Sequence, residues 1–219
     1  MHRPEIVLFD LDGTLTDAAP GIVNGYRLVL DHFGIEQPDE ATMRTYLGPP
    51  LAVTWREHYD FTDEQVADGL RIYREYYHDL GMFENEVFDG IPEVLRQLTQ
   101  DGVTLATATS KPDYSATRII EHFGLAGYFT FIGAANLEGT RDSKALVIEH
   151  TLEQLEANAR THRILMVGDR HHDVQGAREH GIDTIGVLWG YGDAEELTRA
   201  GAISLVESPE KLGQLLLNR

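Results

Sequence analysis

The chain has 219 residues, which is enough to bury a substantial core as one large domain or as a domain with a small insert. Its 36 acidic residues outnumber the 18 lysines and arginines and give a net charge of −18, which repels nucleic-acid phosphates and disfavours nucleic-acid binding as the main role. The sequence contains no cysteine, which excludes disulfides, thiolate metal sites and catalytic thiols.

The first predicted element is a buried strand over Ile6–Phe9, which leads directly into Asp10-Leu11-Asp12-Gly13-Thr14. Alternate residues of a strand point to the same face, so Asp10 and Asp12 are expected close together. At about 4 Å and an effective dielectric constant near 20, two carboxylates repel by roughly 4 kcal/mol. Either one carboxyl is protonated, or a cation lies between the two, or the chain turns the second away. Gly13 allows a sharp turn that exposes backbone N–H groups to an anion.

The next segment, from Thr16 to Val87, shows helical patterns and no convincing strand. The predicted helices are Pro20–His32, Glu40–Tyr46 and Asp63–Leu80. Thr62 and Gln65 form the pattern of a capping box at the start of the third helix, and Gly48-Pro49-Pro50 interrupts the segment. We therefore predict an all-helical insert over residues 16–87, within a domain made of residues 1–15 and 88–219.

Four more apolar runs rich in β-branched residues predict buried strands: Val103–Ala108, Phe129–Ile132, Ile164–Val167 and Thr184–Val187. Helical patterns separate or follow them: Pro92–Gln100, Pro112–Phe123 with Pro112 at the first helical position, Asp142–Leu155, Val174–His180 and Pro209–Leu217. This alternation predicts an α/β fold, a doubly wound parallel sheet with helices on both faces.

Polar residues follow the predicted strands, and ligands of open α/β sheets bind at the carboxyl ends of strands. The strand-end groups are Asp10 and Asp12, then Thr109-Ser110-Lys111, then Arg141 and Lys144, then Gly168-Asp169 and Asp173. Carboxylates suit Mg²⁺, so a cation among Asp10, Asp169 and Asp173 would relieve the repulsion. Asp12 would then be free to hold or release a proton.

Lysine is rare in this chain, with three lysines against fifteen arginines. Two of the three, Lys111 and Lys144, fall at predicted strand ends, where a compact ammonium can approach an anion more closely than a broad guanidinium.

Other ligand motifs are missing or incomplete. There is no GxxxxGK[ST] loop, the offsets of an EF-hand do not recur, and Gly190-Tyr191-Gly192 lacks the third glycine of a dinucleotide fingerprint. The adjacent His171 and His172 at a helix start are more typical of solvated residues than of metal ligands.

Taken in order, these segments resemble the four motifs of the haloacid dehalogenase superfamily. Asp10 to Asp17 resembles the first motif, Thr109 the second, Lys144 the third, and Gly168-Asp169 with Asp173 the fourth. The resemblance covers essentially the whole chain. It implies a Rossmann-like core with a small all-helical cap domain inserted after the first strand.

The resemblance also implies roles. Asp10 would be the nucleophile that forms an aspartyl-phosphate, and Asp12 the general acid and base. Thr109 would bind the phosphoryl group, and Lys144 would neutralise its charge. The metal set, for Mg²⁺, would be Asp10, Asp12 through its backbone carbonyl, Asp169 and Asp173. Asp12 argues against carbon–halogen cleavage, because the dehalogenases of the superfamily lack an aspartate at this position.

Within the superfamily, Leu47 to Leu51 and Thr109 to Pro112 are similar to phosphoglycolate phosphatases. We therefore expect a Mg²⁺-dependent phosphatase of small phosphomonoesters such as 2-phosphoglycolate. Candidate substrate or phosphate contacts are Gly13, Ser110, Lys111, Gly48, Pro49 and Arg27, although Arg27 also fits a solvated helix residue. The alternatives are a broad nucleotide or sugar phosphatase, a pyrophosphatase, a sugar phosphomutase and a non-enzymatic phosphate-binding regulator. A phospho-accepting receiver domain fits less well, because its motifs come in another order.

The expected partner is therefore a small phosphorylated metabolite, with no nucleic acid and no membrane, and the expected state is a monomer or homodimer. No segment approaches the roughly 18 consecutive apolar residues of a membrane span. The apolar run near the N-terminus is too short for a signal peptide. We expect a cytoplasmic protein.

Overall fold

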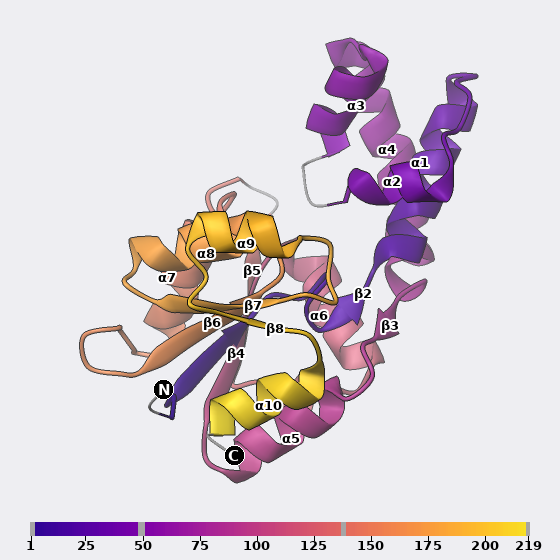
Figure 1. Cartoon of the computed structure of the whole chain (residues 1–219). Coiled ribbons are helices and arrows are strands. Elements are labelled where there is room, and N and C mark those ends of the chain that lie inside the picture. Colours follow the sequence, from indigo (N-terminus) through magenta and orange to yellow (C-terminus); the bar gives the residue numbers. More distant parts are fainter. Residues whose placement is uncertain (1–2, 48–50, 137–138, 218–219) are drawn as a thin grey trace. The chain divides into compact units, whose positions relative to one another are not determined.

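The computed structural model describes residues 3–47, 51–136 and 139–217, and the chain divides into two compact units (Figure 1). The core unit consists of Met1–Asp17 and Val87–Arg219, and the helical unit consists of Ala18–Glu86. No helix in the described part of the chain has both the length and the hydrophobicity of a transmembrane span.

The core unit contains a parallel sheet of six strands in the order β5-β4-β1-β6-β7-β8. The strands are β1 Ile6–Phe9, β4 Thr104–Pro112, β5 Phe131–Ala135, β6 Ile164–Gly168, β7 Asp183–Val187 and β8 Ser204–Val206. β1 pairs with β4 on one side and with β6 on the other, and Phe9 stands in register with Thr107 and Val167. The residues after β1 therefore emerge between the ends of β4 and β6, where the strand order changes direction and where such sheets bind ligands.

Helices cover both faces of this sheet, as the alternating sequence pattern predicts. They are α5 Ile91–Gln100, α6 Asp113–His122, α7 Lys144–Gln154, α8 His171–Glu179, α9 Ala194–Ala200 and α10 Pro209–Leu217, with a 3₁₀ turn over Ala126–Tyr128. Figure 1 shows α5 and α10 together on one side of the sheet and α7 and α8 on the other. Ile6 and Leu8 of β1 pack in one buried cluster with Val147 of α7 and Ala177 of α8.

The helical unit contains α1 Ala19–His32, α2 Glu40–Thr45, α3 Leu51–Tyr59, α4 Asp63–Asp79 and a 3₁₀ turn over Gly81–Phe83. Aromatic side chains fill its interior: Trp55 and Tyr26 are both buried, with ring centroids 5.8 Å apart. The capping box at α4 is confirmed, since Gln65 N donates to Thr62 Oγ1 at 3.3 Å and Thr62 N donates to Gln65 Oε1 at 2.9 Å.

The doubly wound parallel sheet is confirmed, with several local corrections. Helices α3 and α9 and the short edge strand β8 were not predicted; α3 follows directly on the Gly-Pro-Pro interruption, which hides its start. The third predicted strand lies two residues further along, at Phe131–Ala135. Pro112 is not the first helical residue, because it ends β4 and precedes α6 with an extended ψ of 142°.

Two very short strands were also missed at the ends of the insert. β2 Thr16–Asp17 and β3 Glu86–Val87 pair with each other, so the segment from Thr16 to Val87 is not entirely helical. The chain thus leaves the core unit and returns to it through adjacent backbone segments.

Candidate active site

The turn after β1 brings the first two acids to the carboxyl edge of the sheet. Asp10 N donates to Val167 O at 2.9 Å, which continues the pairing of β1 with β6. Gly13 has a φ of +82°, and a Cβ at this position would lie 2.2 Å from Asp169 Oδ2, so both backbone conformation and space require glycine. Its N–H donates to Thr16 O at 2.7 Å. The turn itself therefore uses the Gly13 N–H, and the expectation that the turn exposes N–H groups to an anion stays a prediction for its other N–H groups.

Lys144 lies at the centre of the site. Its Nζ is 2.9 Å from Asp10 Oδ1 and 2.7 Å from Asp173 Oδ1, and it donates to Ala108 O at 2.9 Å. The side chain is 5% exposed. Burial alone would lower the pKa of Lys144, but the carboxylates of Asp10 and Asp173 outweigh burial and raise that pKa. The residue is therefore a fixed ammonium.

Three carboxylates converge beside this ammonium. Asp10, Asp169 and Asp173 each contribute an oxygen, and these oxygens lie within 4.8 Å of one another. Burial, together with the charges of Asp173 and Asp10, raises the pKa of Asp169 well above its usual range. Burial also raises the pKa of Asp173, to about 6, although Lys144 acts in the opposite direction. Lys144 alone thus does not keep all three carboxyls ionised, and a further cation would favour their charged forms.

Asp12 does not join this cluster through its side chain. Its Oδ2 pairs with Lys111 Nζ, and its Oδ1 is buried without a hydrogen-bond partner. The chain therefore turns the second acid away from the first, which was one of the three solutions open from the sequence. The crowding of carboxylates that remains is among Asp10, Asp169 and Asp173.

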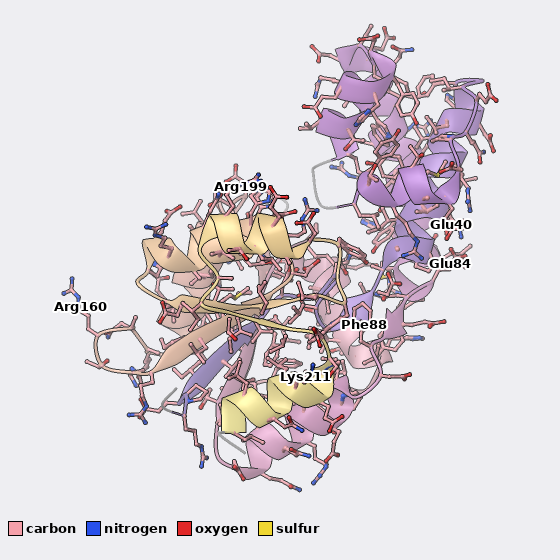
Figure 2. The ribbon with its side chains drawn as sticks, viewed as in Figure 1. Glu40, Glu84, Phe88, Arg160, Arg199 and Lys211 are labelled. Atoms are coloured by element: carbon pink, nitrogen blue, oxygen red, sulfur yellow. The ribbon has the colours of Figure 1, made fainter. Side chains whose placement is uncertain are left out.

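The end of β4 supplies the hydroxyl and the second lysine. Thr109 is 2% exposed, and its Oγ1 accepts a hydrogen bond from Lys111 N at 3.2 Å. Ser110, the next residue, is exposed. The Lys111 side chain is 7% exposed. The third lysine, Lys211, which Figure 2 labels, is instead largely exposed and pairs with Glu207. The two strand-end lysines are therefore distinct from the surface lysine in environment.

The other residues considered in the sequence belong to the helical unit or, for His171, to the start of α8. Arg27 belongs to the helical unit, where its guanidinium donates to Asn24 Oδ1 at 3.1 Å and lies 3.8 Å from Glu40, which Figure 2 labels. Gly48 and Pro49 lie outside the described residues. The ring of His171 is directed at Glu196 Oε1, 2.6 Å from Nδ1, and no histidine belongs to the carboxylate cluster in the described part of the chain.

Other contacts of the site were missed at the sequence level. Thr14 is fully buried, and its Oγ1 donates to Asp169 Oδ1 at 3.2 Å. Tyr191 N donates to Asp169 Oδ2 at 2.7 Å. The signals in the sequence are the Gly-Thr pair after Asp12 and the Gly190-Tyr191-Gly192 segment, which by itself resembles only an incomplete dinucleotide fingerprint.

Comparisons with known proteins agree with this geometry. The sequence model of the family described as haloacid dehalogenase-like hydrolase matches residues 7–187. The chain is 42% identical over 218 residues to the tyrosine-protein kinase PtkA of Mycobacterium tuberculosis, covering 97% of this chain and 74% of that protein. It is 42% identical over 191 residues to a 5'-nucleotidase of Pseudomonas aeruginosa, covering 87% of this chain and 86% of the relative.

More distant relatives and solved structures extend the same pattern. A phosphoglycolate phosphatase of Chromobacterium violaceum is 29% identical and covers 97% of this chain and 96% of its own. A crystal structure of a predicted phosphatase from Clostridium acetobutylicum superposes with a TM-score of 0.91 at 39% identity, with full coverage of both chains. The described fold is thus shared with a solved structure titled as a predicted phosphatase, and the family model covers most of the chain.

Proposed function

Because this chain is a phosphatase of the haloacid dehalogenase-like hydrolase family, we propose that it hydrolyses a small phosphomonoester with Mg²⁺ through an aspartyl-phosphate on Asp10. The observation that carries this proposal is the buried cluster of Asp10, Asp169 and Asp173 around a single ammonium. Such an arrangement suits an enzyme that binds a cation and a phosphate side by side.

The donor set fits Mg²⁺ better than a softer metal. The cluster offers carboxylate oxygens only, and Mg²⁺ prefers a few carboxylates together with water and phosphate oxygens. Asp10, Asp169 and Asp173 would hold the cation, with the backbone carbonyl of Asp12 as a further ligand. Bound there, the cation would neutralise the charge of the transferring phosphoryl group.

Three residues then act on the phosphoryl group. The Asp10 carboxylate would attack phosphorus, and the bond from phosphorus to the leaving oxygen would break. Lys144 remains charged next to Asp10 and would stabilise the negative charge of the phosphoryl oxygens. The Thr109 hydroxyl accepts from Lys111 N, so its hydrogen is directed elsewhere and would be donated to a phosphoryl oxygen.

Asp12 would move the protons of both steps. Its Oδ1 is buried without a hydrogen-bond partner, whereas Lys111 holds Oδ2 in place. Oδ1 is thus the atom that would protonate the leaving alcohol and then take a proton from the attacking water. Hydrolysis of the aspartyl-phosphate would regenerate Asp10.

Two substrate classes have support. The resemblance of Leu47 to Leu51 favours 2-phosphoglycolate, whereas the higher identity to the relative named 5'-nucleotidase favours a nucleoside 5'-monophosphate. Ser110, Lys111 and, from the helical unit, Arg27 are proposed substrate contacts. The kinase activity in the name PtkA belongs to that relative. For this chain we propose water as the acceptor, with Asp12 Oδ1 as its base.

The test is phosphate release in the presence of Mg²⁺ from 2-phosphoglycolate, nucleoside monophosphates, sugar phosphates and pyrophosphate. Asp10→Asn is the blank, and Asp183→Asn is the matched control, because Asp183 is exposed at the other end of β7. We expect the wild type and Asp183→Asn to be active, Asp10→Asn to retain less than about 1% of turnover, and a chelator to abolish it.

Three results would contradict the proposal. Full activity in chelator would exclude the cation, and residual activity of Asp10→Asn well above about 1% would exclude the nucleophile. Transfer of phosphate from ATP to a tyrosine-containing peptide without net phosphate release would replace the hydrolase by a phosphotransferase.

A further inference from the structure

The segment that follows β7 contacts one acid of the site directly. Tyr191 N donates to Asp169 Oδ2 at 2.7 Å, while Thr14 Oγ1 donates to Oδ1 of the same carboxylate at 3.2 Å. Asp169 is fully buried. Its orientation is therefore fixed by two donors that come from different parts of the chain, one after β1 and one after β7.

The glycines on either side of Tyr191 make this contact possible. A Cβ on Gly190 would lie 2.3 Å from Gly13 O, 2.4 Å from Asp169 Cβ and 2.5 Å from Asp169 Oδ2. A Cβ on Gly192 would lie 2.1 Å from Asp169 O. Neither glycine has a positive φ, so it is space rather than backbone conformation that requires glycine here. The segment packs its backbone directly onto Asp169.

The same segment also contacts the two places where the core unit borders the helical unit in sequence. Tyr191 OH donates to Asp17 Oδ1 at 3.1 Å, and Trp189 Nε1 donates to Thr14 O at 3.1 Å. The Trp189 ring lies edge-on to the ring of Phe88, which Figure 2 labels, with centroids 6.4 Å apart. Burial and the nearby carboxylates of Asp12 and Asp17 raise the pKa of Tyr191, so its hydroxyl remains a donor.

We propose that Trp189-Gly190-Tyr191 is a positioning segment that holds the Asp169 carboxylate in line with Asp10 and Asp173 for a divalent cation. The inference rests on the proposed function, because it concerns the cation of that site. Outer groups that orient a metal ligand commonly change metal affinity by about 10- to 100-fold when they are altered. Here the segment is anchored in turn by Thr14, Asp17 and Phe88, so its own position is fixed by packing within the core unit.

This assignment gives Gly190-Tyr191-Gly192 a role other than nucleotide binding. The glycines permit close approach to a carboxylate rather than to a pyrophosphate, and the N–H between them is directed at Asp169. Asp169 is buried beside Asp10 and Asp173, where nearby carboxylates disfavour its charged form and hydrogen-bond donors favour it. The two donors keep it aimed into the cluster.

The experiment measures Mg²⁺ binding itself, by calorimetry on purified wild-type and variant protein. Gly190→Ala is the main variant, and we expect its Mg²⁺ affinity to fall at least tenfold. Gly127→Ala is the matched control, because Gly127 has open space around the position of a Cβ. Far-UV circular dichroism and Tm without Mg²⁺ establish that each variant is folded.

A milder pair of variants tests the anchor at Asp17 without introducing a clash. Tyr191→Phe and Asp17→Ala each remove the hydrogen bond between the two side chains, and we expect Mg²⁺ affinity to fall about two- to tenfold, the range of one hydrogen bond. Asp17→Asn keeps an acceptor oxygen for the Tyr191 hydroxyl. Its affinity should therefore stay within about twofold of wild type.

The outcomes separate this inference from the proposed function. Wild-type binding of Mg²⁺ that is unchanged in folded Gly190→Ala and in Tyr191→Phe would overturn the positioning role and leave the phosphatase intact. Equal losses in Asp17→Asn and Asp17→Ala would also overturn the anchoring step. If wild-type protein releases phosphate without binding Mg²⁺, the assignment of Mg²⁺ to this site is wrong, and the positioning role inferred here is overturned as well.

Discussion

Helices α4 and α8 begin with similar backbone contacts, but the side chains that make them serve different purposes. At α4, Gln65 Oε1 accepts from Thr62 N at 2.9 Å, and Thr62 Oγ1 accepts from Gln65 N at 3.3 Å. At α8, Asp173 occupies the corresponding third position, and its Oδ2 accepts from Arg170 N at 3.0 Å. The other oxygen of Asp173, however, lies 2.7 Å from Lys144 Nζ inside the acid cluster.

The difference shows that a side chain that caps a helix start can also take part in a functional site when it is buried. Thr62 is exposed at the surface of the helical unit, so its hydrogen bonds affect only the stability of α4. Asp173 is 1% exposed, and the positive end of the α8 dipole helps to stabilise its charge. The same carboxylate therefore begins a helix and belongs to the proposed cation site. Substitutions can separate these two tasks.

The largest expected effect comes from Asp173→Asn. The asparagine oxygen can still accept from Arg170 N, so α8 should keep its start, while Lys144 loses one of its two carboxylates. We expect at least tenfold weaker Mg²⁺ binding and at least 100-fold lower turnover with the fold intact. Asp173→Ala also removes the acceptor at the helix start, so its free energy of unfolding should fall by a further amount of about 1 kcal/mol. Calorimetry, kinetics and urea unfolding measure the three quantities; near-normal Mg²⁺ affinity in Asp173→Asn would separate Asp173 from the cation.

A large effect on stability is expected from Lys144→Met. The substitution leaves Asp10, Asp169 and Asp173 without their buried ammonium, and breaking a buried pair typically costs about 3 to 5 kcal/mol. The control is Arg71→Met in α4, where the guanidinium pairs with two acids at 2.6 and 2.9 Å on an exposed surface, worth about 0 to 1 kcal/mol. Urea unfolding in chelator at pH 7 measures both. Similar losses in the two variants would contradict the distinction between buried and exposed charge.

A pH-dependent effect is expected from Glu196→Gln, next to the start of α8. Glu196 Oε1 accepts from Arg170 Nε at 2.8 Å and from His171 N at 2.9 Å. Although burial acts to raise it, these partners lower the pKa of Glu196 to about 2 from its usual 4.5. A depressed carboxyl pKa stabilises the fold above about pH 4.5, and this contribution is lost as the pH falls toward 2.

The variant should therefore be less stable than wild type by about 1 to 2 kcal/mol at pH 7, after allowance for solvent screening of a partly exposed group. The difference should shrink as the pH falls below about 4.5. Urea midpoints of both proteins at pH 7, 5, 4 and 3 provide the measurement. A difference that is constant across this range would assign the effect of Glu196 to packing rather than to charge.

The two helix starts also show what sequence can predict. The start of α4 was found because Thr-x-x-Gln before a periodic apolar pattern is a local signal. The start of α8 was predicted at Val174 rather than His171, because Arg170 has no acceptor for a cap and the capping carboxylate comes from inside the helix. A local sequence pattern does not predict a helix start when the capping side chain also contacts a residue far away in the sequence.

The candidate site likewise contains residues that the sequence predicts and contacts that it does not. Residues at strand ends were found, because parallel strands bring their carboxyl ends to one edge whatever their separation in sequence. The two groups that donate hydrogen bonds to Asp169 could not be predicted from the sequence. Thr14 is 155 residues away from Asp169, and the 22 residues between Asp169 and Tyr191 include a helix and a strand.

The smallest expected effect comes from Thr62→Ala at the start of α4. The substitution removes the acceptor for Gln65 N and should cost about 1 kcal/mol, or roughly 2 to 4 °C in Tm for a chain of this size. Thr62→Ser keeps the hydroxyl and should lie within a few tenths of a kcal/mol of wild type. Because the helical unit supplies none of the proposed cation ligands, Mg²⁺ affinity should be unchanged in both variants. A loss of Mg²⁺ affinity in Thr62→Ala comparable to that in Asp173→Asn would mean that the helical unit takes part in cation binding, and the separation of tasks between the two helix starts would fail.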